Sequence, residues 1–204
     1  MRIGIFGGSF DPIHFGHLIL ADRCREVVGL DKILFVPCAV QPHKLGGPQA
    51  KKRQRLEMIE FAISGNTSFE LSRIEIDRGE TSYTIDTIRE MKQVHFNDEL
   101  FLILGDDSLE SFPSWKDPKE ICELANLVVV PRVGSGDVEF EPLKGLVSDD
   151  RIQQFESHVV SSPKIEISST EIRKRVNDKM SIRYLTPRPV EKYIETQKIY
   201  LKKD

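Results

Sequence analysis

Gly7-Gly8-Ser9-Phe10-Asp11-Pro12-Ile13-His14-Phe15-Gly16-His17 follows a short apolar run and leads into a helical pattern at residues 18–28. This order predicts a strand, a glycine-rich turn and a helix whose first turn begins near His17. Unpaired N–H groups and the positive end of the helix dipole make such a junction an anion site, and glycines let a phosphate approach the backbone. The side chains of His14 and His17 can both donate hydrogen bonds to phosphate oxygens. The stretch therefore predicts a phosphate-binding loop at the end of the first strand.

The rest of the chain alternates between strand-like and helix-like segments. Apolar runs bounded by turn residues occur at residues 3–6, 33–36, 69–76, 100–104, 127–130 and 165–167. Helical spacing occurs at residues 18–28, 56–63, 85–91 and 172–176, and a closing helix is expected within residues 187–201. Residues 39–50 and 133–145 are rich in Pro, Gly and charge and are expected to form surface loops. The alternation predicts a doubly wound α/β fold with a mostly parallel sheet, whose ligands bind beyond the C-terminal ends of the strands.

The composition is that of one folded domain, expected to span residues 1–204. The chain is 39% hydrophobic and 30% charged, and its net charge of −3 lacks the basic surplus with which proteins bind long nucleic acids. Cys24, Cys38 and Cys122 are widely spaced and form no C-x-x-C pair, which argues against a disulfide framework. We find no signal peptide and no apolar run of about 20 residues, the length that a membrane-spanning helix needs. A cytoplasmic protein without a membrane partner is expected.

The first stretch differs from the common phosphate fingerprints, since the chain has no Gly-Lys dipeptide for a P-loop and no G-x-G-x-x-G after a strand. The spacing of His14 and His17 also differs from the H-E-x-x-H of zinc helices, and no third ligand is obvious nearby, so no metal site is expected. The structural alternative is a helix start with two incidental histidines. The eleven residues resemble the signature of the bacterial nicotinate mononucleotide adenylyltransferases. These belong to the nucleotidylyltransferase superfamily, which shares a His-x-Gly-His motif with class I aminoacyl-tRNA synthetases.

This resemblance implies a Rossmann-like fold and an enzyme that uses ATP. It implies that Gly7, Gly8, Ser9 and Phe10 contact the nucleotide and that His14 and His17 are catalytic. The residue types and their spacing alone indicate phosphate binding. The transfer reaction is implied only by the resemblance.

A second motif, Ile167-Ser168-Ser169-Thr170-Glu171-Ile172-Arg173, follows the last predicted strand and opens a helix. Ser168 and Glu171 could form a capping box, which would explain the hydroxyl and the acid but not Arg173. A hydroxyl-rich helix start with an arginine one turn inside also suits a polyphosphate. The stretch resembles the Ile-Ser-x-Thr-x-Ile-Arg motif of the same superfamily. We therefore expect Ser168, Ser169 and Thr170 to bind ATP and Arg173 to be catalytic.

A third motif, Gln41-Pro42-His43-Lys44, resembles the Pro-Pro-His-Lys stretch of the nicotinate mononucleotide enzymes, with Gln41 in place of the first proline. The resemblance implies that Lys44 adds a cation near the triphosphate, and the structural alternative is an ordinary exposed lysine. The basic residues that follow are expected to form a solvated face. They are Lys51, Lys52, Arg53 and Arg55.

The middle of the chain carries residues that, by the same resemblance, form the acceptor pocket. Trp115 would stack on the pyridine ring, Thr84 and its neighbouring backbone would meet the nicotinate carboxylate, and Asp106 would contact ribose hydroxyls. Arg132 would suit a ribose or a phosphate. An aromatic plane suits a flat electron-poor ring, and a carboxylate accepts two hydroxyl donors. The structural alternatives are a helix cap, a turn and a surface aromatic.

The implied reaction moves an adenylyl group from ATP to the 5′-phosphate of nicotinate mononucleotide and needs no protein nucleophile. His17 and the backbone of Gly8 and Ser9 are expected at the α-phosphate. His14, Lys44, Ser169, Thr170 and Arg173 are expected at the β- and γ-phosphates. Mg²⁺ would accompany ATP and be held by phosphates and water, because the sequence offers no carboxylate cage. Asp11 is interpreted as a turn residue.

Two other functions are consistent with the motifs. One is a nucleotidyltransferase with another acceptor, such as nicotinamide mononucleotide or phosphopantetheine, and the other is a nucleotide-sensing module without turnover. Retention of both histidines, Lys44 and Arg173 favours an enzyme. The expected partners are ATP and nicotinate mononucleotide, without nucleic acid or membrane, and the sequence leaves a homo-oligomer open.

Overall fold

The computed structural model describes residues 1–39, 48–79, 81–131, 137–161, 163 and 165–201. Its centre is a sheet of five parallel strands in the order β3-β2-β1-β4-β5. The strands are β1 (Arg2–Gly8), β2 (Lys32–Pro37), β3 (Phe69–Leu71), β4 (Glu99–Gly105) and β5 (Asn126–Val130). Every neighbouring pair is parallel, so the predicted doubly wound α/β fold is confirmed.

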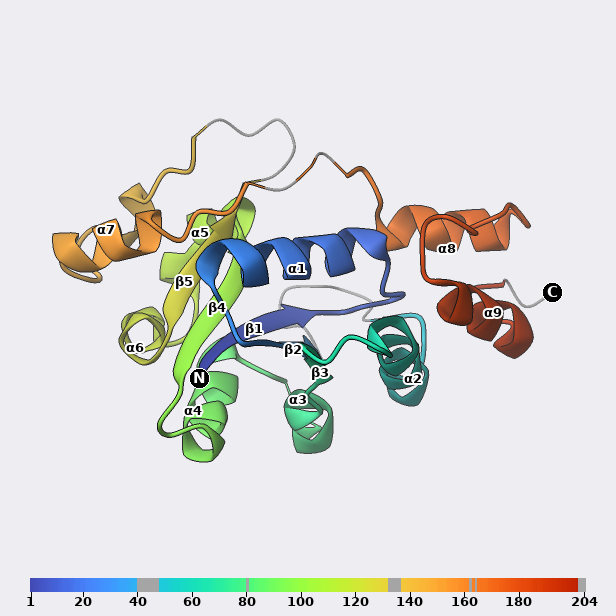
Figure 1. Ribbon diagram of the computed structural model, residues 1–204, viewed down its shortest axis with the longest axis horizontal. Helices are drawn as coiled ribbons and strands as arrows, with labels where there is room; N and C mark the ends of the chain where they lie inside the picture. Colours follow the sequence, from blue (N-terminus) through green and yellow to red (C-terminus); the bar gives the residue numbers. More distant parts are fainter. Residues whose placement is uncertain (40–47, 80, 132–136, 162, 164, 202–204) are drawn as a thin grey trace.

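Helices cover both faces of this sheet, with α1 on one side and α3 and α4 on the other (Figure 1). The described α-helices are α1 (Phe15–Val28), α2 (Lys52–Ile63), α3 (Ile74–Arg78), α4 (Thr84–Val94), α5 (Asp106–Ser111), α6 (Pro118–Leu124), α7 (Asp149–Glu156), α8 (Ser169–Asn177) and α9 (Arg188–Gln197). Two 3₁₀ turns are η1 (Phe112–Ser114) and η2 (Glu141–Leu143).

Successive strand residues belong to different hydrophobic cores, because side chains alternate between the faces of a sheet. Ile33 and Phe35 pack in the core that includes Ala21 of α1 and Met58 of α2. Leu34 and Val36 pack in the core that includes Ile88 of α4. The continuous apolar runs of β1, β2, β4 and β5 follow from this burial on both faces.

Two of the predicted strands are corrected. The strand expected at residues 69–76 ends at Leu71, and its second half forms α3, which stops at Gly79 in a left-handed conformation with φ of 78°. The alternation of Ile74 and Ile76 with polar residues imitates a strand, but a glycine in this conformation ends a helical turn. Residues 165–167 form no strand, and the place beside β5 is taken by an isolated parallel bridge between Val129 and Val159.

Several predicted boundaries also move. Helix α1 begins at Phe15, two residues earlier than expected, and the closing helix ends at Gln197. The expected surface loop at 133–145 contains η2, and its Phe140 and Leu143 are buried in the core around α5 and η1, because both side chains are apolar. Residues 40–47 of the other expected loop lie outside the described residues.

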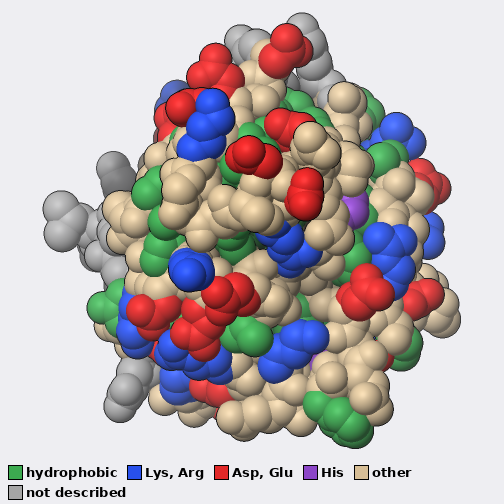
Figure 2. Space-filling model, turned by 90° about the vertical axis from the view of Figure 1, so that its left-hand side faces the viewer, with side chains coloured by type: hydrophobic (Ala, Val, Ile, Leu, Met, Phe, Trp, Pro, Cys, Tyr) green, Lys and Arg blue, Asp and Glu red, His purple; other side chains and the backbone are tan. Residues whose placement is uncertain are grey.

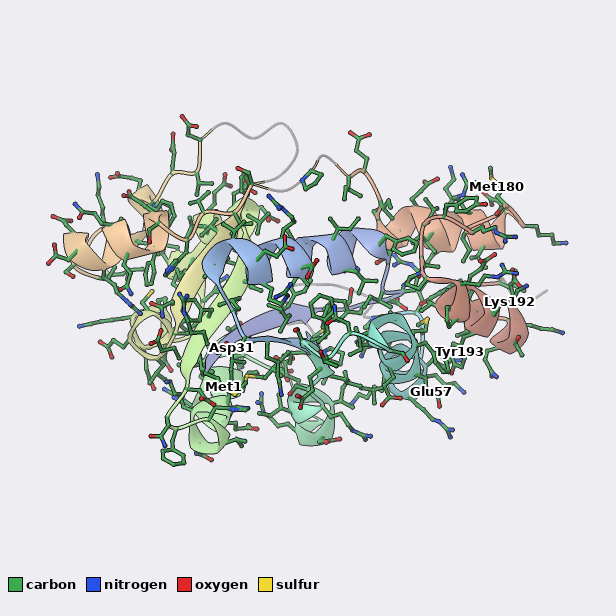
Figure 3. The ribbon with its side chains drawn as sticks, viewed as in Figure 1. Met1, Asp31, Glu57, Met180, Lys192 and Tyr193 are labelled. Carbon is green, nitrogen blue, oxygen red and sulfur yellow. The ribbon has the colours of Figure 1, made fainter. Side chains whose placement is uncertain are left out.

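The C-terminal helix packs against α2. Tyr193 of α9 donates a hydrogen bond to the carboxylate of Glu57 on α2, and the two side chains lie close together in Figure 3. On the face shown in Figure 2, Lys and Arg side chains are interspersed with Asp and Glu side chains. Within the described part of the chain, no helix has the length and apolar character needed to cross a bilayer.

Candidate active site

A cleft of about 2200 Å³ opens at the C-terminal ends of the strands. Gly7 and Gly8 at the end of β1 and Leu104 and Gly105 at the end of β4 lie in its floor. The two strands are neighbours, and the chain turns to opposite sides of the sheet after them, which is where open α/β sheets bind ligands. The cleft lies where the sequence predicted the ligand.

The first loop (residues 9–14) connects β1 to α1 and brings the two predicted histidines together. The rings of His14 and His17 are stacked, with centroids 3.7 Å apart and planes 23° from parallel. The backbone N–H of His14 donates a hydrogen bond of 3.2 Å to Nδ1 of His17. A neutral imidazole carries one proton, so that of His17 is on Nε2. His17 can therefore offer an N–H donor from Nε2.

Burial sets the charge of this pair. It lowers the pKa of His14 to about 4, and burial together with the nearby His14 ring lowers the pKa of His17 well below its usual range. Both imidazoles are neutral near pH 7, since two stacked rings removed from water disfavour the charged form. Each histidine then serves as a hydrogen-bond donor or acceptor and not as a cation.

A side chain at position 16 would crowd the ring of His14. A Cβ atom built on Gly16 would lie 3.0 Å from Nδ1 of His14, closer than ordinary van der Waals contact. Gly7 differs, because a Cβ atom there would meet nothing within 4 Å. Gly7 thus leaves open space at the cleft floor, while Gly16 lets the imidazole lie against the start of α1.

Phe10 does not contribute its side chain to the cleft. The residue is fully buried, its ring is 5.6 Å from that of Phe6, and it packs in the core on the α1 side of the sheet. Its neighbours Gly8 and Ser9 line the cleft as expected. The ring of Phe10 therefore fixes the first loop to the hydrophobic core.

The second predicted motif packs directly on the first loop. Ser168 Oγ accepts a hydrogen bond of 3.1 Å from the backbone N–H of Glu171, which is the first half of the expected capping box. Ser169 Oγ donates to the carbonyl of Pro12 at 2.9 Å, and Arg173 Nη1 donates to the carbonyl of Asp11 at 2.8 Å. The two motifs are separated by 150 residues in the sequence and lie in one wall of the cleft.

Asp11 is more than the turn residue that the sequence suggested. Its buried carboxylate accepts hydrogen bonds from the backbone N–H groups of Gln49 (2.7 Å) and Ala50 (3.0 Å) and from the hydroxyl of Tyr200 (2.7 Å). A buried carboxylate needs such donors to offset its loss of water. Asp11 therefore links the first loop to the start of α2 and to the end of the chain.

Arg55 corrects a second expectation, since it is 1% exposed and not part of a solvated face. Its Nη1 donates to the carbonyl of Ser9 at 2.8 Å and its Nη2 to that of Cys38 at 2.7 Å. Lys51, Lys52 and Arg53 are exposed as expected. The signal for burial was helical spacing, because Arg55 lies three and four residues before the buried Met58 and Ile59.

The opposite wall holds predicted acceptor residues. Thr84 begins α4 and lines the cleft, as do Ser82 and Tyr83 before it. The partly exposed ring of Trp115 also lines the cleft, packs 5.2 Å from the ring of Phe112 and donates a hydrogen bond of 3.4 Å to Ser111.

Asp106 begins α5, but its neighbour Asp107 is the one of the two that lines the cleft. The Oδ1 atom of Asp106 accepts a hydrogen bond of 2.9 Å from the backbone N–H of Asp107. Lys44 and Arg132 lie outside the described residues.

Glu75 lines the cleft and was missed, because it falls in the segment that was expected to be a strand. It accepts a hydrogen bond of 2.8 Å from Thr87 Oγ1. Burial raises the pKa of its carboxyl group. Among the described residues, no group of three or more His, Cys, Asp or Glu side chains could hold a metal ion.

The chain matches known proteins over nearly its full length. Residues 5–175 match the cytidylyltransferase-like family model. A Thermus thermophilus protein named "Probable nicotinate-nucleotide adenylyltransferase" is 43% identical over 98% of this chain and 100% of its own length. A Dictyoglomus thermophilum protein of the same name is 42% identical over the same shares. The chain belongs to the nicotinate-nucleotide adenylyltransferase family.

Solved structures show that this adenylyltransferase shares its fold with distant proteins. The Plasmodium falciparum nicotinic acid mononucleotide adenylyltransferase complexed with NaAD superimposes with a TM-score of 0.74 at 22% identity, over 98% of this chain and 97% of that one. The same Plasmodium protein complexed with APC gives a TM-score of 0.73 at 21% identity, over 98% and 96% of the two chains. The resemblance found in the sequence motifs is confirmed for the family and for the fold.

Proposed function

We propose that this adenylyltransferase moves AMP from ATP to the 5′-phosphate of nicotinate mononucleotide, giving nicotinate adenine dinucleotide and pyrophosphate in NAD biosynthesis. The observation that carries the proposal is the convergence of the first loop and the start of α8 on one wall of a cleft. The opposite wall presents Thr84 and Trp115. The names of the relatives support the same reaction.

The chain's own residues bind and align two anions. An oxygen of the acceptor phosphate forms a bond to the α-phosphorus, the bond from that phosphorus to the bridging oxygen breaks, and pyrophosphate leaves. The Nε2–H of His17 and the backbone of Gly8 and Ser9 are assigned to the α-phosphate. Donors directed at charge that develops during transfer stabilise the transition state more than the substrate.

The leaving pyrophosphate is assigned to the other phosphate-binding residues. These are His14, Lys44, Ser169, Thr170 and Arg173. Ser169 and Arg173 are supported by their place at the cleft and their contacts with the first loop. Because His14 is neutral near pH 7, the positive charge in this set comes from the lysine and the arginine.

Mg²⁺ bound to ATP would neutralise charge on the phosphates. We assign Mg²⁺ mainly to phosphate and water oxygens, because the ion keeps several waters and binds substrate phosphates at nucleotide sites. The protein then needs to bind the complex of metal and nucleotide and does not need a site for the free ion.

The acceptor is assigned to the wall formed by α4, α5 and η1. The Trp115 ring suits a pyridine ring, and the N-terminus of α4 at Thr84 favours a carboxylate through its free N–H groups. Asp106 is assigned to ribose hydroxyls together with its neighbour Asp107, and Arg132 to ribose or phosphate. We place the reaction in the cytoplasm, which is supported by three cysteines that are widely spaced and form no C-x-x-C pair.

A pyrophosphate-release assay with ATP and three acceptors tests the function. We expect release with nicotinate mononucleotide and much less with nicotinamide mononucleotide or phosphopantetheine. Release confined to phosphopantetheine would overturn the acceptor. ATP binding without release in the presence of any acceptor would instead support the nucleotide-sensing module.

A further inference from the structure

Arg55 lies behind the cleft wall and bonds to two residues that form it. Ser9 and Cys38 line the cleft, whereas the buried Arg55 does not. The carbonyl oxygen of Ser9 accepts a hydrogen bond of 2.8 Å from Nη1 of Arg55, and that of Cys38 accepts one of 2.7 Å from Nη2. A planar guanidinium can hold two acceptors at fixed separation, which an ammonium cannot do. Arg55 thus clasps the ends of β1 and β2 just where the two strands stop pairing.

The clasp controls which backbone groups face a ligand. A carbonyl oxygen that faced the cleft would repel a phosphate, and these two are turned toward Arg55 instead. The carbonyl of Gly8 is also occupied, by the backbone N–H of Cys38 at 2.9 Å. Because the two ends of a trans peptide point in opposite directions, the N–H of Ser9 is directed away from β2. Ser9 therefore presents a donor at the cleft wall.

A second peptide of the first loop is oriented in the same way. Thr186 Oγ1 donates to the carbonyl of Ile13 at 2.8 Å, and the N–H at the other end of that peptide, on His14, points to His17 Nδ1. Side chains outside the first loop thus fix the direction of its peptides. Arg55 does this for the end nearest β1.

The positive charge of Arg55 is buried without a carboxylate partner in the described part of the chain. The side chain forms no ion pair with any carboxylate in the described part of the chain, and its Nε atom is buried without a hydrogen-bond partner there. Asp11 receives its hydrogen bonds from Gln49, Ala50 and Tyr200. An incompletely compensated buried charge is costly, and a polyanion in front of the wall would reduce that cost.

We propose that Arg55 is a positioning residue for the triphosphate: it turns the carbonyls of Ser9 and Cys38 away from the cleft and places a buried positive charge behind the first loop. The inference rests on the proposed function in one respect, that the anion held by the first loop is the triphosphate of ATP. It assigns to Arg55 no contact with the substrate.

The test compares Arg55→Lys and Arg55→Met with Arg53→Met, a matched control on the same helix whose side chain is 88% exposed. Calorimetry measures binding of ATP alone and of nicotinate mononucleotide alone to each folded variant. We expect Arg55→Lys to weaken ATP binding by about tenfold to hundredfold, the loss of a charge-assisted hydrogen bond, and Arg55→Met to weaken it further. Acceptor binding should change much less than ATP binding in both, since Arg55 donates its hydrogen bonds to Ser9 and Cys38 and not to the residues assigned to the acceptor.

Unchanged ATP binding in folded Arg55→Lys would overturn the proposal, as would equal losses for both ligands, which indicate general disruption. Should both variants fail to fold, amide NMR of the wild-type protein decides the question. Addition of inorganic tripolyphosphate is expected to shift the Phe10 amide strongly, because Arg55 holds the carbonyl of the same peptide, that of Ser9. An unmoved Phe10 amide beside shifted α8 amides contradicts the proposal. Because these readouts are binding measurements, they judge Arg55 even if no acceptor releases pyrophosphate.

Discussion

At the scale of single residues, the histidine pair shows how burial selects one chemical role from several. An exposed histidine could act as a cation near neutral pH, but stacking and desolvation keep His14 and His17 neutral. The backbone N–H of His14 then selects the tautomer of His17. What remains is a directed N–H donor whose strength does not depend on protonation of the ring.

Replacement of His17 tests this role. His17→Ala should lower turnover by about a hundredfold or more, as expected when one donor to a transition state is removed. The variant should still fold but melt at a lower temperature, since the ring also packs against those of Phe6, Phe10 and His14. Pyrophosphate release and a thermal melt on the same preparation check both points. Near-normal turnover in this variant would contradict the assignment to the α-phosphate.

The low pKa of His14 predicts a dependence of stability on pH. In the unfolded chain its pKa returns to near 6.5, whereas in the folded protein it is about 4. Between these values the unfolded state binds a proton that the folded state does not. The free energy of unfolding should therefore be highest above pH 6.5 and fall toward pH 4, by at most about 1.4 kcal/mol per pH unit for this group.

Urea denaturation at pH 5 and pH 7 measures the effect. The loss between the two values should be smaller in His14→Gln than in the wild-type protein, because this variant has no proton to take up at position 14. An identical loss in both proteins would show that His14 is not the group responsible.

At the scale of elements, the first loop owes its shape to segments far away in the sequence. The carbonyls of three successive residues, Asp11, Pro12 and Ile13, accept hydrogen bonds from Arg173, Ser169 and Thr186. The backbone N–H of Phe15 donates to the carbonyl of Leu185 at 3.1 Å. Helix α8 and the segment before α9 thus act as a scaffold for the start of α1.

The last turn of the chain belongs to this scaffold, and Tyr200→Phe tests its contribution. The substitution removes the hydroxyl that donates to the buried carboxylate of Asp11 at 2.7 Å. We expect the free energy of unfolding to fall by about 2 kcal/mol, the cost of removing one partner from a buried charged group. Tyr184→Phe, at a side chain that is 81% exposed, is the control and should change stability by less than about 0.5 kcal/mol. Equal stability of the two variants would contradict the buried role of Tyr200.

The two motifs were predictable from the sequence because each combines chemistry with local geometry. A glycine turn after a strand and a hydroxyl-rich helix start indicate anion sites without knowledge of the rest of the fold. Asp11 and Arg55 could not be placed in this way. Their roles depend on contacts with Tyr200 and Ser9, at separations of 189 and 46 residues, which no local pattern records.

The same limit explains the strand expected at residues 69–76. Alternation of apolar and polar residues predicted an extended segment, but only Phe69–Leu71 pairs with β2. The following residues turn into α3 and bring Glu75 to the cleft. Pairing partners and ligand cavities are properties of the assembled sheet, so this carboxylate was not identified in advance.

At the scale of the whole molecule, the proposed function assigns one wall of the cleft to each substrate. The wall made by the first loop and α8 carries residues assigned to the phosphates, and the wall made by α4, α5 and η1 carries Trp115. Trp115 is the single tryptophan of the chain. Its fluorescence therefore reports on one wall only.

This arrangement predicts different optical responses to the two substrates. Nicotinate mononucleotide should quench the fluorescence of Trp115, because an electron-poor pyridine ring stacks on the indole. ATP alone should leave the emission nearly unchanged, and Trp115→Phe should abolish the signal and weaken acceptor binding. Quenching by ATP alone, with none by the acceptor, would reverse the assignment of the two walls.

Because the first loop depends on residues 169–200, it can take its final shape only late in synthesis of the chain. Ribosomes add about 5–20 residues per second, so about 10–40 s separate synthesis of the first loop from synthesis of Tyr200. During this interval the carbonyls of Asp11, Pro12 and Ile13 have no donors from the C-terminal segments. A nascent chain arrested before Ser169 should be unable to retain ATP, and nucleotide binding would begin only as the last two helices dock.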